Sequence, residues 1–178
     1  ITFIGPSSKV MNMMGDKINS KKIAKEVNVQ TIPGVEKAIR STEEAKEVAN
    51  KIGYPVMIKA SSGGGGKGMR IVRKEEELFS NFDMASSEAL AAFSNSDLYM
   101  EKFIENPRHI EVQVFGDKHS NAIHLGDRDC SMQRRNQKVI EESLSPYLSD
   151  EERQKLHKIA VDIVKGVGYI GAGTIEFI

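Results

Sequence analysis

Residues 55–72 read PVMIKASSGGGGKGMRIV. Two short apolar runs, Pro55–Ala60 and Met69–Val72, flank the glycine-rich segment Ser61–Gly68. This pattern predicts a β-hairpin with an oversized tip. Because glycine has no Cβ, backbone N–H groups in such a loop can approach a polyphosphate closely, and Lys67 adds a cation. We therefore expect the loop to close over a phosphate-bearing ligand; a plain flexible hairpin tip is the alternative.

Two better-known glycine motifs do not fit this loop. Gly63, Gly65 and Gly68 satisfy G-x-G-x-x-G, and the acidic Glu88 lies 20 positions further on. That dinucleotide-binding fingerprint opens a helix, however, whereas a strand follows here. A P-loop would require Gly in place of Ser61 and Ser or Thr in place of Gly68. Neither a Rossmann site nor a P-loop is predicted.

The composition excludes several functional classes. The chain has 178 residues, 39% of them hydrophobic, with 25 Lys+Arg balanced by 25 Asp+Glu. A neutral chain is a poor match for nucleic acid or an acidic membrane, and no apolar run approaches the roughly 18 residues of a membrane span. The single cysteine, Cys130, rules out an internal disulfide and fits a reducing compartment. The chain begins at Ile1 without Met and ends within a strand-like TIEFI, so we expect a central piece of a longer protein.

Helical and strand periodicities alternate along the rest of the chain and predict an α+β fold. Capping-box spacing at Ser41/Glu44 and at Ser149/Glu152 marks the starts of two helices. The predicted helices are Asp16–Val27, the one after Ser41, Lys74–Phe93 and the one after Ser149; further strands are predicted at 98–103, 110–115 and 122–125. The layout is a small βαββαβ-like unit at about 32–103, then a mostly antiparallel sheet with a helix.

Four polar features stand out against these elements. Lys59 ends an apolar strand, where a lysine is costly unless it faces an anion, although a snorkelling surface lysine is the alternative. Glu176 lies between two apolar residues and should be paired or metal-bound. His109 starts a strand and is more simply structural. The stretch 127–138 joins two strands and is dense in charged and amide groups. A solvated loop is its usual interpretation; a strand that lines an anion site is the other.

Several stretches, in this order, resemble the biotin carboxylase component of biotin-dependent carboxylases, which are ATP-grasp enzymes. The resemblance covers essentially the whole chain. The resemblance rests on these motifs: MGDK at 14–17, GYPVMIKAS at 53–61, the glycine loop through Arg70, EKF at 101–103, NPRHIEVQV at 106–114 and RDCSMQRRNQK at 128–138. Many bacterial members have His where this chain has Asn136. The Asn form, with DKI at 16–18 and TIPG at 31–34, is similar to the α subunit of propionyl-CoA carboxylases.

The resemblance implies a role for particular residues of this chain. Lys17 and Lys59 would hold ATP phosphates beneath a lid that contains Gly65 and Gly66. The stretch Glu101, Lys102, Phe103 and Ile104 would read adenine, largely through backbone groups. His109, Gln133 and Asn136 would lie around the nucleotide. Lys138 would bind bicarbonate as the catalytic lysine, and Glu176 would be both an ATP contact and the first of two Mg²⁺ (or Mn²⁺) carboxylates.

The resemblance also implies a reaction, partners and domains. Bicarbonate would attack the γ-phosphate of ATP to give carboxyphosphate, whose CO₂ then carboxylates biotin as carrier substrate. Residues 1–31 would link to a preceding N-terminal domain, 32–103 would form the ATP-grasp lid, and 104–178 the first part of the C subdomain. The second metal carboxylate would follow Ile178, so we expect the chain alone to be inactive.

Partners and rival functions follow from the same resemblance. A biotin carboxyl carrier and a carboxyltransferase would be partners in an oligomeric parent in a bacterial cytoplasm or mitochondrial matrix, without nucleic acid or membrane. The alternatives are another ATP-grasp ligase, such as carbamoyl-phosphate synthetase, or a non-catalytic nucleotide-binding module. Bicarbonate and biotin dependence would separate them.

Overall fold

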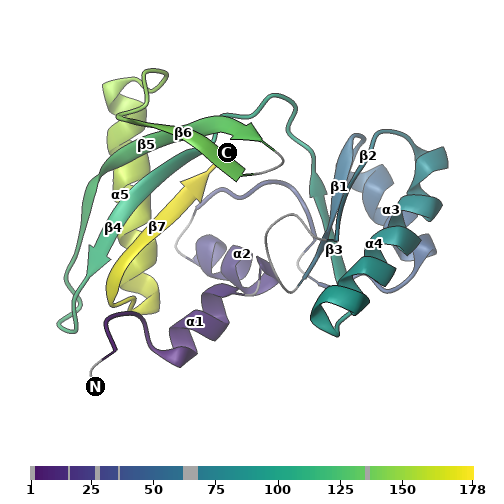
Figure 1. The fold of residues 1–178 in the computed structure, drawn as a ribbon, viewed down its shortest axis with the longest axis horizontal. Coiled ribbons are helices and arrows are strands. Elements are labelled where there is room, and N and C mark those ends of the chain that lie inside the picture. The colour runs from purple at the N-terminus through teal and green to yellow at the C-terminus, as the bar shows by residue number, and fades with distance from the viewer. Residues whose placement is uncertain (1–2, 16, 27–28, 36, 62–67, 135–136) are drawn as a thin grey trace. The chain divides into compact units, whose positions relative to one another are not determined.

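The structure is a computed structural model that describes residues 3–15, 17–26, 29–35, 37–61, 68–134 and 137–178 (Figure 1). Its contacts divide the chain into two compact units. We call Met14–Lys22 with Gln30–Glu105 the hairpin unit, and Ile1–Met13, Ile23–Val29 and Asn106–Ile178 the sheet unit. Among the described helices, none is long and apolar enough to cross a membrane. Two N-terminal helices, α1 (Ser8–Gly15) and α2 (Lys17–Glu26), contribute residues to both units.

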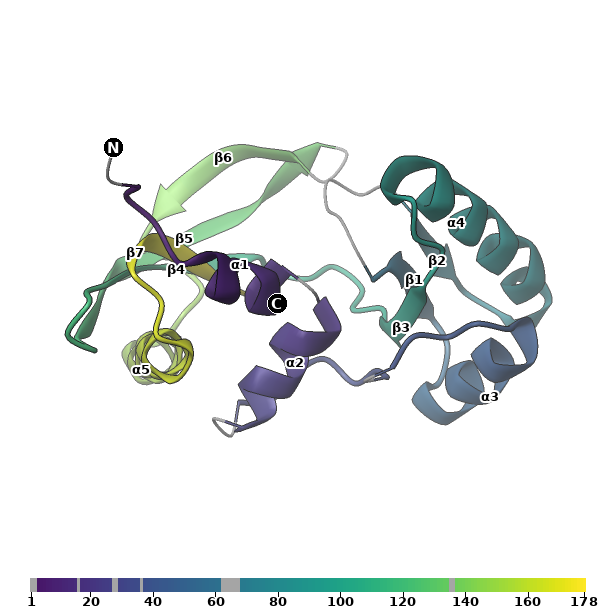
Figure 2. The same ribbon diagram turned by 90° about the horizontal axis from the view of Figure 1, so that it is seen from below.

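The hairpin unit is a three-stranded antiparallel sheet with two helices packed on one face (Figure 2). The strand order is β2-β1-β3, with β1 in the centre. Its elements are α3 (Thr42–Ile52), β1 (Val56–Ala60), β2 (Met69–Val72), the 3-10 turn η1 (Glu75–Glu77), α4 (Leu78–Phe93) and β3 (Leu98–Lys102). The alternation of buried Val56, Ile58 and Ala60 along β1 places these side chains against α4, as period two requires.

Local signals explain where α3 begins and ends. The Oγ of Ser41 accepts a hydrogen bond from the amide of Glu44 at 3.2 Å, which satisfies one of the free amides at the helix start. Gly53 ends the helix at φ 83°, a conformation that residues with a Cβ rarely adopt. Gly53 therefore turns the chain directly into β1.

The sheet unit is a four-stranded antiparallel sheet in the order β6-β5-β4-β7, with one long helix across one face (Figure 1). Its elements are β4 (Ile110–Gly116), β5 (Ala122–Arg134), β6 (Gln137–Ser143), α5 (Asp150–Val167) and β7 (Gly171–Phe177). Val112 and Val114 of β4 pack against Ala160 and Val164 of α5 and form the core. Helix α5 begins with the predicted capping box, in which Ser149 and Glu152 bond to each other's backbone amides.

The structure confirms the predicted hairpin strands and capped helices and corrects three details. Helix α1 was not predicted. Residues 127–134 are not a solvated loop, because β5 continues through them with Asp127, Asp129 and Cys130 buried. The expected first strand of the βαββαβ-like unit is reduced to two isolated bridges, Gly34 with Glu101 and Ile39 with Leu98.

Candidate functional site

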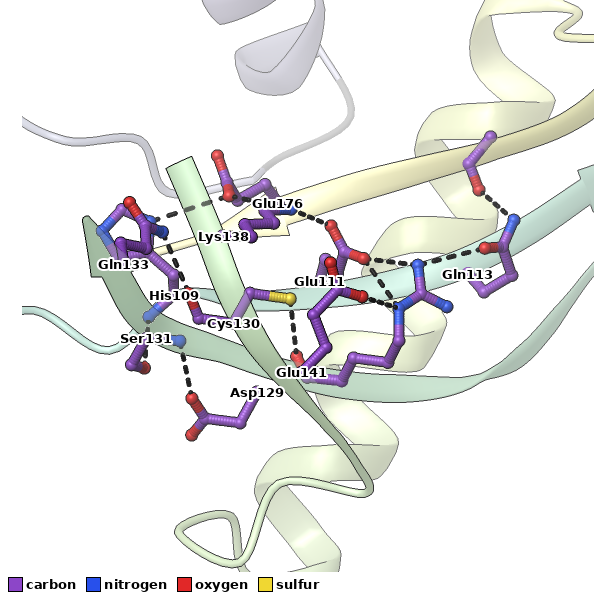
Figure 3. A network of polar contacts seen from close by, with 12 residues as sticks. His109, Glu111, Gln113, Asp129, Cys130, Ser131, Gln133, Lys138, Glu141 and Glu176 are labelled. Atoms are coloured by element: carbon purple, nitrogen blue, oxygen red, sulfur yellow. Dashed lines mark hydrogen bonds and ion pairs between the residues drawn. The ribbon is translucent and has the colours of Figure 1, made fainter. Parts of the chain in front are cut away.

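A buried carboxylate organises the polar face of the sheet unit (Figure 3). Glu111 lies on β4, and one of its oxygens accepts hydrogen bonds from both Nε and Nη2 of Arg128 on β5, the first at 2.7 Å. Its other oxygen accepts from Nζ of Lys138 on β6. A buried charge is stable only when it is paired and hydrogen-bonded, and Glu111 meets both conditions.

This pairing keeps Glu111 and Lys138 ionised. Burial alone would raise the pKa of Glu111, but the hydrogen bonds and charges of Lys138 and Arg128 outweigh it and hold that pKa below its ordinary value. Burial would likewise lower the pKa of Lys138, yet its hydrogen bond to Glu111 raises it on balance. Lys138 is therefore a fixed cation at neutral pH.

Lys138 also faces Glu176 at the end of the sheet, and Glu176 in turn lies near His109. The Nζ of Lys138 lies 3.5 Å from Oε1 of Glu176 on β7, and the same oxygen lies 3.6 Å from Nδ1 of His109. Both distances exceed that of a good hydrogen bond. The buried Nδ1 of His109 makes no hydrogen bond to any described residue. Buried polar atoms are normally satisfied, so His109 and Glu176 fit a place that an additional polar ligand occupies.

Gln133 and Cys130 complete this cluster. Gln133 lies directly opposite Lys138 in the β5–β6 ladder, so the two side chains share one face of the sheet. The Nε2 of Gln133 donates to the carbonyl of Cys130 at 3.0 Å. Burial, with the nearby charge of Glu111, raises the pKa of the Cys130 thiol to about 11. Cys130 is therefore a neutral thiol at physiological pH rather than a nucleophile.

The hairpin unit has its own buried carboxylate, Glu101 of β3. One oxygen of Glu101 accepts a hydrogen bond from Nζ of Lys59 on β1, and the other lies 2.6 Å from Nζ of Lys21 on α2. Burial would raise the pKa of Glu101, but the charge of Lys59 and the hydrogen bonds of both lysines hold it below its ordinary value. Lys59 therefore faces an anion in this structure, namely Glu101, and its contact with an ATP phosphate stays a prediction.

The residues after Glu101 are held mainly by the chain itself. The Nζ of Lys102 donates to the carbonyls of Gly53 and Tyr54 at 2.9 and 2.8 Å. The amides of Lys102 and Phe103 donate to the carbonyls of Pro33 and Pro55. Ile104 lies beyond the strand end with an exposed side chain. The Lys102 side chain thus positions this stretch rather than facing solvent.

The structure brings together some of the predicted site residues and leaves others undescribed. In the sheet unit it gathers His109, Gln133, Lys138 and Glu176; in the hairpin unit it joins Lys59 to Glu101. Gly65, Gly66 and Asn136 lie outside the described residues, as does the side chain of Lys17. Glu111, Arg128 and Lys21 were not predicted as site residues. Glu111 left a signal as a charged residue within the apolar β4, and Arg128 lies in the charged stretch 127–138.

The donors around Glu176 fit a magnesium ion better than the other acidic cluster does. Among the described residues, Glu111, Cys130 and Glu141 offer ligand atoms within 4.8 Å of one another. Both oxygens of Glu111 are already bound by cations, however, and the Cys130 thiol is protonated. Glu176 is half-exposed, and its contacts to the described cations are long, at 3.5 and 3.6 Å. Mg²⁺ commonly takes one or two carboxylates together with phosphates and water, so Glu176 suits one such position.

Comparison with known proteins identifies close relatives of this chain. A family model described as the carbamoyl-phosphate synthase L chain, ATP-binding domain, matches residues 16–178. The small subunit of 2-oxoglutarate carboxylase from Hydrogenobacter thermophilus is 54% identical over the whole chain, which covers 38% of that protein. The mitochondrial propionyl-CoA carboxylase alpha chain of Mus musculus is 53% identical, with 25% of its length covered. The chain thus spans well under half of the curated relatives it matches.

Solved structures agree with these sequences. The biotin carboxylase domain dimer of the Hydrogenobacter thermophilus enzyme, in complex with MgADP, ADP and bicarbonate, matches 99% of the chain and 39% of its own length. Its TM-score is 0.95 at 54% identity. A biotin carboxylase–beta-gamma-ATP complex from Campylobacter jejuni matches 99% of the chain and 40% of its own length, with a TM-score of 0.97 at 52% identity. The expected α+β fold of the ATP-grasp type is confirmed.

Proposed function

Because this chain belongs to the family of carbamoyl-phosphate synthase L chain ATP-binding domains, and within it resembles the biotin carboxylases, we propose that the protein containing it carboxylates biotin with ATP and bicarbonate. The observation that carries the proposal is the convergence of Lys138, His109 and Glu176 beside the buried Glu111. A fixed ammonium group can hold an anion such as bicarbonate, while the nearby carboxylate suits a metal that binds phosphate.

The reaction divides into two steps that place different demands on the protein. Bicarbonate attacks the γ-phosphate of ATP, which forms carboxyphosphate and releases ADP. Carboxyphosphate then breaks down to CO₂ and phosphate, and CO₂ bonds to a ureido nitrogen of biotin as that nitrogen loses its proton. The first step is a phosphoryl transfer, in which the protein positions the reactants and neutralises charge. Lys138 orients bicarbonate and Lys59 binds phosphate. Mg²⁺ held by Glu176 would supply charge stabilisation on the phosphates.

Further roles are proposed for the remaining residues. Lys17, with Gly65 and Gly66 in a lid, would bind the phosphates, and the stretch Glu101–Ile104 would read adenine. Gln133 and Asn136 would lie around the nucleotide. We also propose that 32–103 is the lid and 104–178 part of the C subdomain, after a linking segment at 1–31. The unit boundaries at Gln30 and Glu105 support the bounds of the lid, although the same unit also takes in Met14–Lys22 from the proposed linking segment.

The partners and the location are proposed from the relatives. A biotin carboxyl carrier and a carboxyltransferase would complete the enzyme, because the relatives are named as chains of carboxylases and the chain covers only part of them. One solved relative is a dimer, which supports an oligomeric parent. The names of relatives include mitochondrial and bacterial proteins, which supports a mitochondrial matrix or bacterial cytoplasm. The relatives of 54% and 53% identity are named as carboxylases of 2-oxoglutarate and of propionyl-CoA. The final acceptor of the carboxyl group would therefore be chosen outside this chain.

The proposal is tested by bicarbonate-dependent ATP hydrolysis in the complete polypeptide that contains residues 1–178. Lys138→Ala should lower that activity by about 100-fold or more, the usual cost of removing a charge-stabilising donor. Lys158→Ala is the matched control, because Lys158 is an exposed lysine of α5 that pairs only with Asp162 at 2.5 Å among the described residues. Full bicarbonate-dependent activity in Lys138→Ala would remove the proposed role. ATP hydrolysis that needs neither bicarbonate nor biotin would favour a different ligase, and ATP binding without hydrolysis would favour a binding module.

A further inference from the structure

The hairpin unit contains two lysines that share one buried carboxylate. The side chains of Glu101, Lys21 and Lys59 are 5%, 15% and 16% exposed. Each oxygen of Glu101 is bound by a different lysine. Two ammonium groups and one carboxylate carry a net charge of +1. We call these three residues the lysine–glutamate triad.

Among the residues that the structure describes, no second carboxylate pairs with either lysine of the triad. Both ammonium groups lie over the ring of Tyr99, at 5.5 Å for Lys21 and 6.0 Å for Lys59. Lys21 also donates to the carbonyl of Ile32 at 3.2 Å. Ring faces and carbonyls stabilise a cation partially but supply no negative charge. Because an uncompensated charge is costly at low exposure, an anion that reaches the triad is strongly favoured.

The two lysines differ in how they are held. Lys59 is the penultimate residue of β1. Ala60 ends the strand, and the chain continues toward the glycine-rich segment. Among the described residues its Nζ makes one hydrogen bond, to Glu101. Lys21 comes from α2 and is anchored at two points, Glu101 and the carbonyl of Ile32. Lys59 is therefore the lysine that can exchange partners, and Lys21 is the one that stays.

We propose that Lys21 is a positioning residue that keeps Glu101 neutralised while Lys59 transfers to a phosphate of the bound nucleotide. This inference rests on the proposed ATP-binding function. If Lys21 were missing, Lys59 would be the sole cation on a buried carboxylate. A phosphate could then recruit Lys59 only by leaving Glu101 unpaired, which is strongly unfavourable. Lys21 thus makes Lys59 available, and its effect is confined to ligands that carry phosphate.

The test compares ADP with adenosine, which shares the base and ribose but has no phosphate. Each is measured by competition against ATP in the complete polypeptide, with the unmodified protein beside Lys21→Met, Lys21→Arg and Lys22→Met. Lys22 is the matched control because it is the exposed neighbour of Lys21 on the same helix. Lys21→Met should weaken the binding of ADP by about 10-fold to 100-fold, as expected for the loss of a charged hydrogen-bond partner. The affinity for adenosine should change less than about 2-fold, and Lys21→Arg should keep most of the ADP affinity of the unmodified protein.

A second variant separates positioning from a direct contact with phosphate. If Lys21 acts through Glu101, the ADP penalty of Lys21→Met should disappear in a Glu101→Gln background, because no buried carboxylate is left to neutralise. An ADP penalty that persists in that background would overturn the proposal, as would equal losses for ADP and adenosine. If the unmodified protein bound neither ADP nor ATP, the proposed function itself would fail, and that result is visible before any variant is made.

Discussion

Replacing Glu111 with glutamine removes one negative charge and leaves the shape of the side chain almost unchanged. Arg128 and Lys138 then face a neutral amide in place of a carboxylate that accepts three charge-assisted hydrogen bonds. Each such bond contributes about 1.5–3 kcal/mol, and breaking a fully buried ion pair costs about 3–5 kcal/mol. The amide oxygen can still accept one bond. The Arg128 and Lys138 side chains, 27% and 31% exposed, also regain some hydration. We therefore expect Glu111→Gln to lower the free energy of unfolding by about 2–4 kcal/mol.

The measurement is urea unfolding followed by circular dichroism. With a urea m-value of about 2 kcal/mol/M, the midpoint should fall by about 1–2 M. Glu141→Gln is the matched control, since Glu141 contacts the same Arg128 at 3.4 Å but is 43% exposed. Exposed pairs contribute about 0–1 kcal/mol, so its midpoint should hardly move. Equal midpoints for the two variants would refute the conclusion that Glu111 organises this face.

Two further predictions concern the sheet unit. Gly116→Ala should lower the free energy of unfolding by about 3 kcal/mol, because the new Cβ would lie 2.0 Å from the carbonyl oxygen of Tyr169. Gly15→Ala, whose Cβ would meet nothing within 4 Å, should be neutral or stabilising, and similar losses in both would contradict the packing. Burial would raise the pKa of Asp127, but the Ser145 amide, His157 and Arg153 lower that pKa on balance. The stability that ionised Asp127 contributes is therefore complete above the unfolded pKa of about 4 and is lost as the pH falls through the lower folded pKa. Asp127→Asn should therefore destabilise the protein by about 3 kcal/mol at pH 7. It should also weaken the pH dependence of the urea midpoint between about pH 5 and 2. An unchanged pH dependence in that range would show that other carboxylates control the acid-side loss of stability.

Local sequence patterns predicted most of the secondary structure because their causes are local. The capping box joins Ser149 to Glu152, only three positions further on, and the glycine that ends α3 acts through its own backbone. The extension of β5 through Asp127 and Asp129 was ambiguous for a physical reason. A charged stretch reads as a solvated loop unless partners bury it, and those partners include Arg153 of α5, which donates to Asp127 at 3.0 Å.

The candidate site was only partly predictable for the same reason. Lys59, Lys138 and Glu176 could be singled out by their positions in the sequence and by a family resemblance. Their partners could not, because Glu111 is 27 residues from Lys138, and Glu101 is 42 residues from Lys59. No local pattern specifies which of many charged residues will meet across such separations.

The sequence by itself therefore determined the strand–glycine–strand hairpin, the capped helices, the α+β class and the family, since each depends on short spacings or on motifs in order. Only the tertiary structure decided which charges pair. It placed Glu111 between Arg128 and Lys138, and Glu101 between Lys21 and Lys59. The physical reason is that a charge becomes expensive only after the fold has buried it, and burial is a property of the assembled sheet and its neighbours rather than of any one segment.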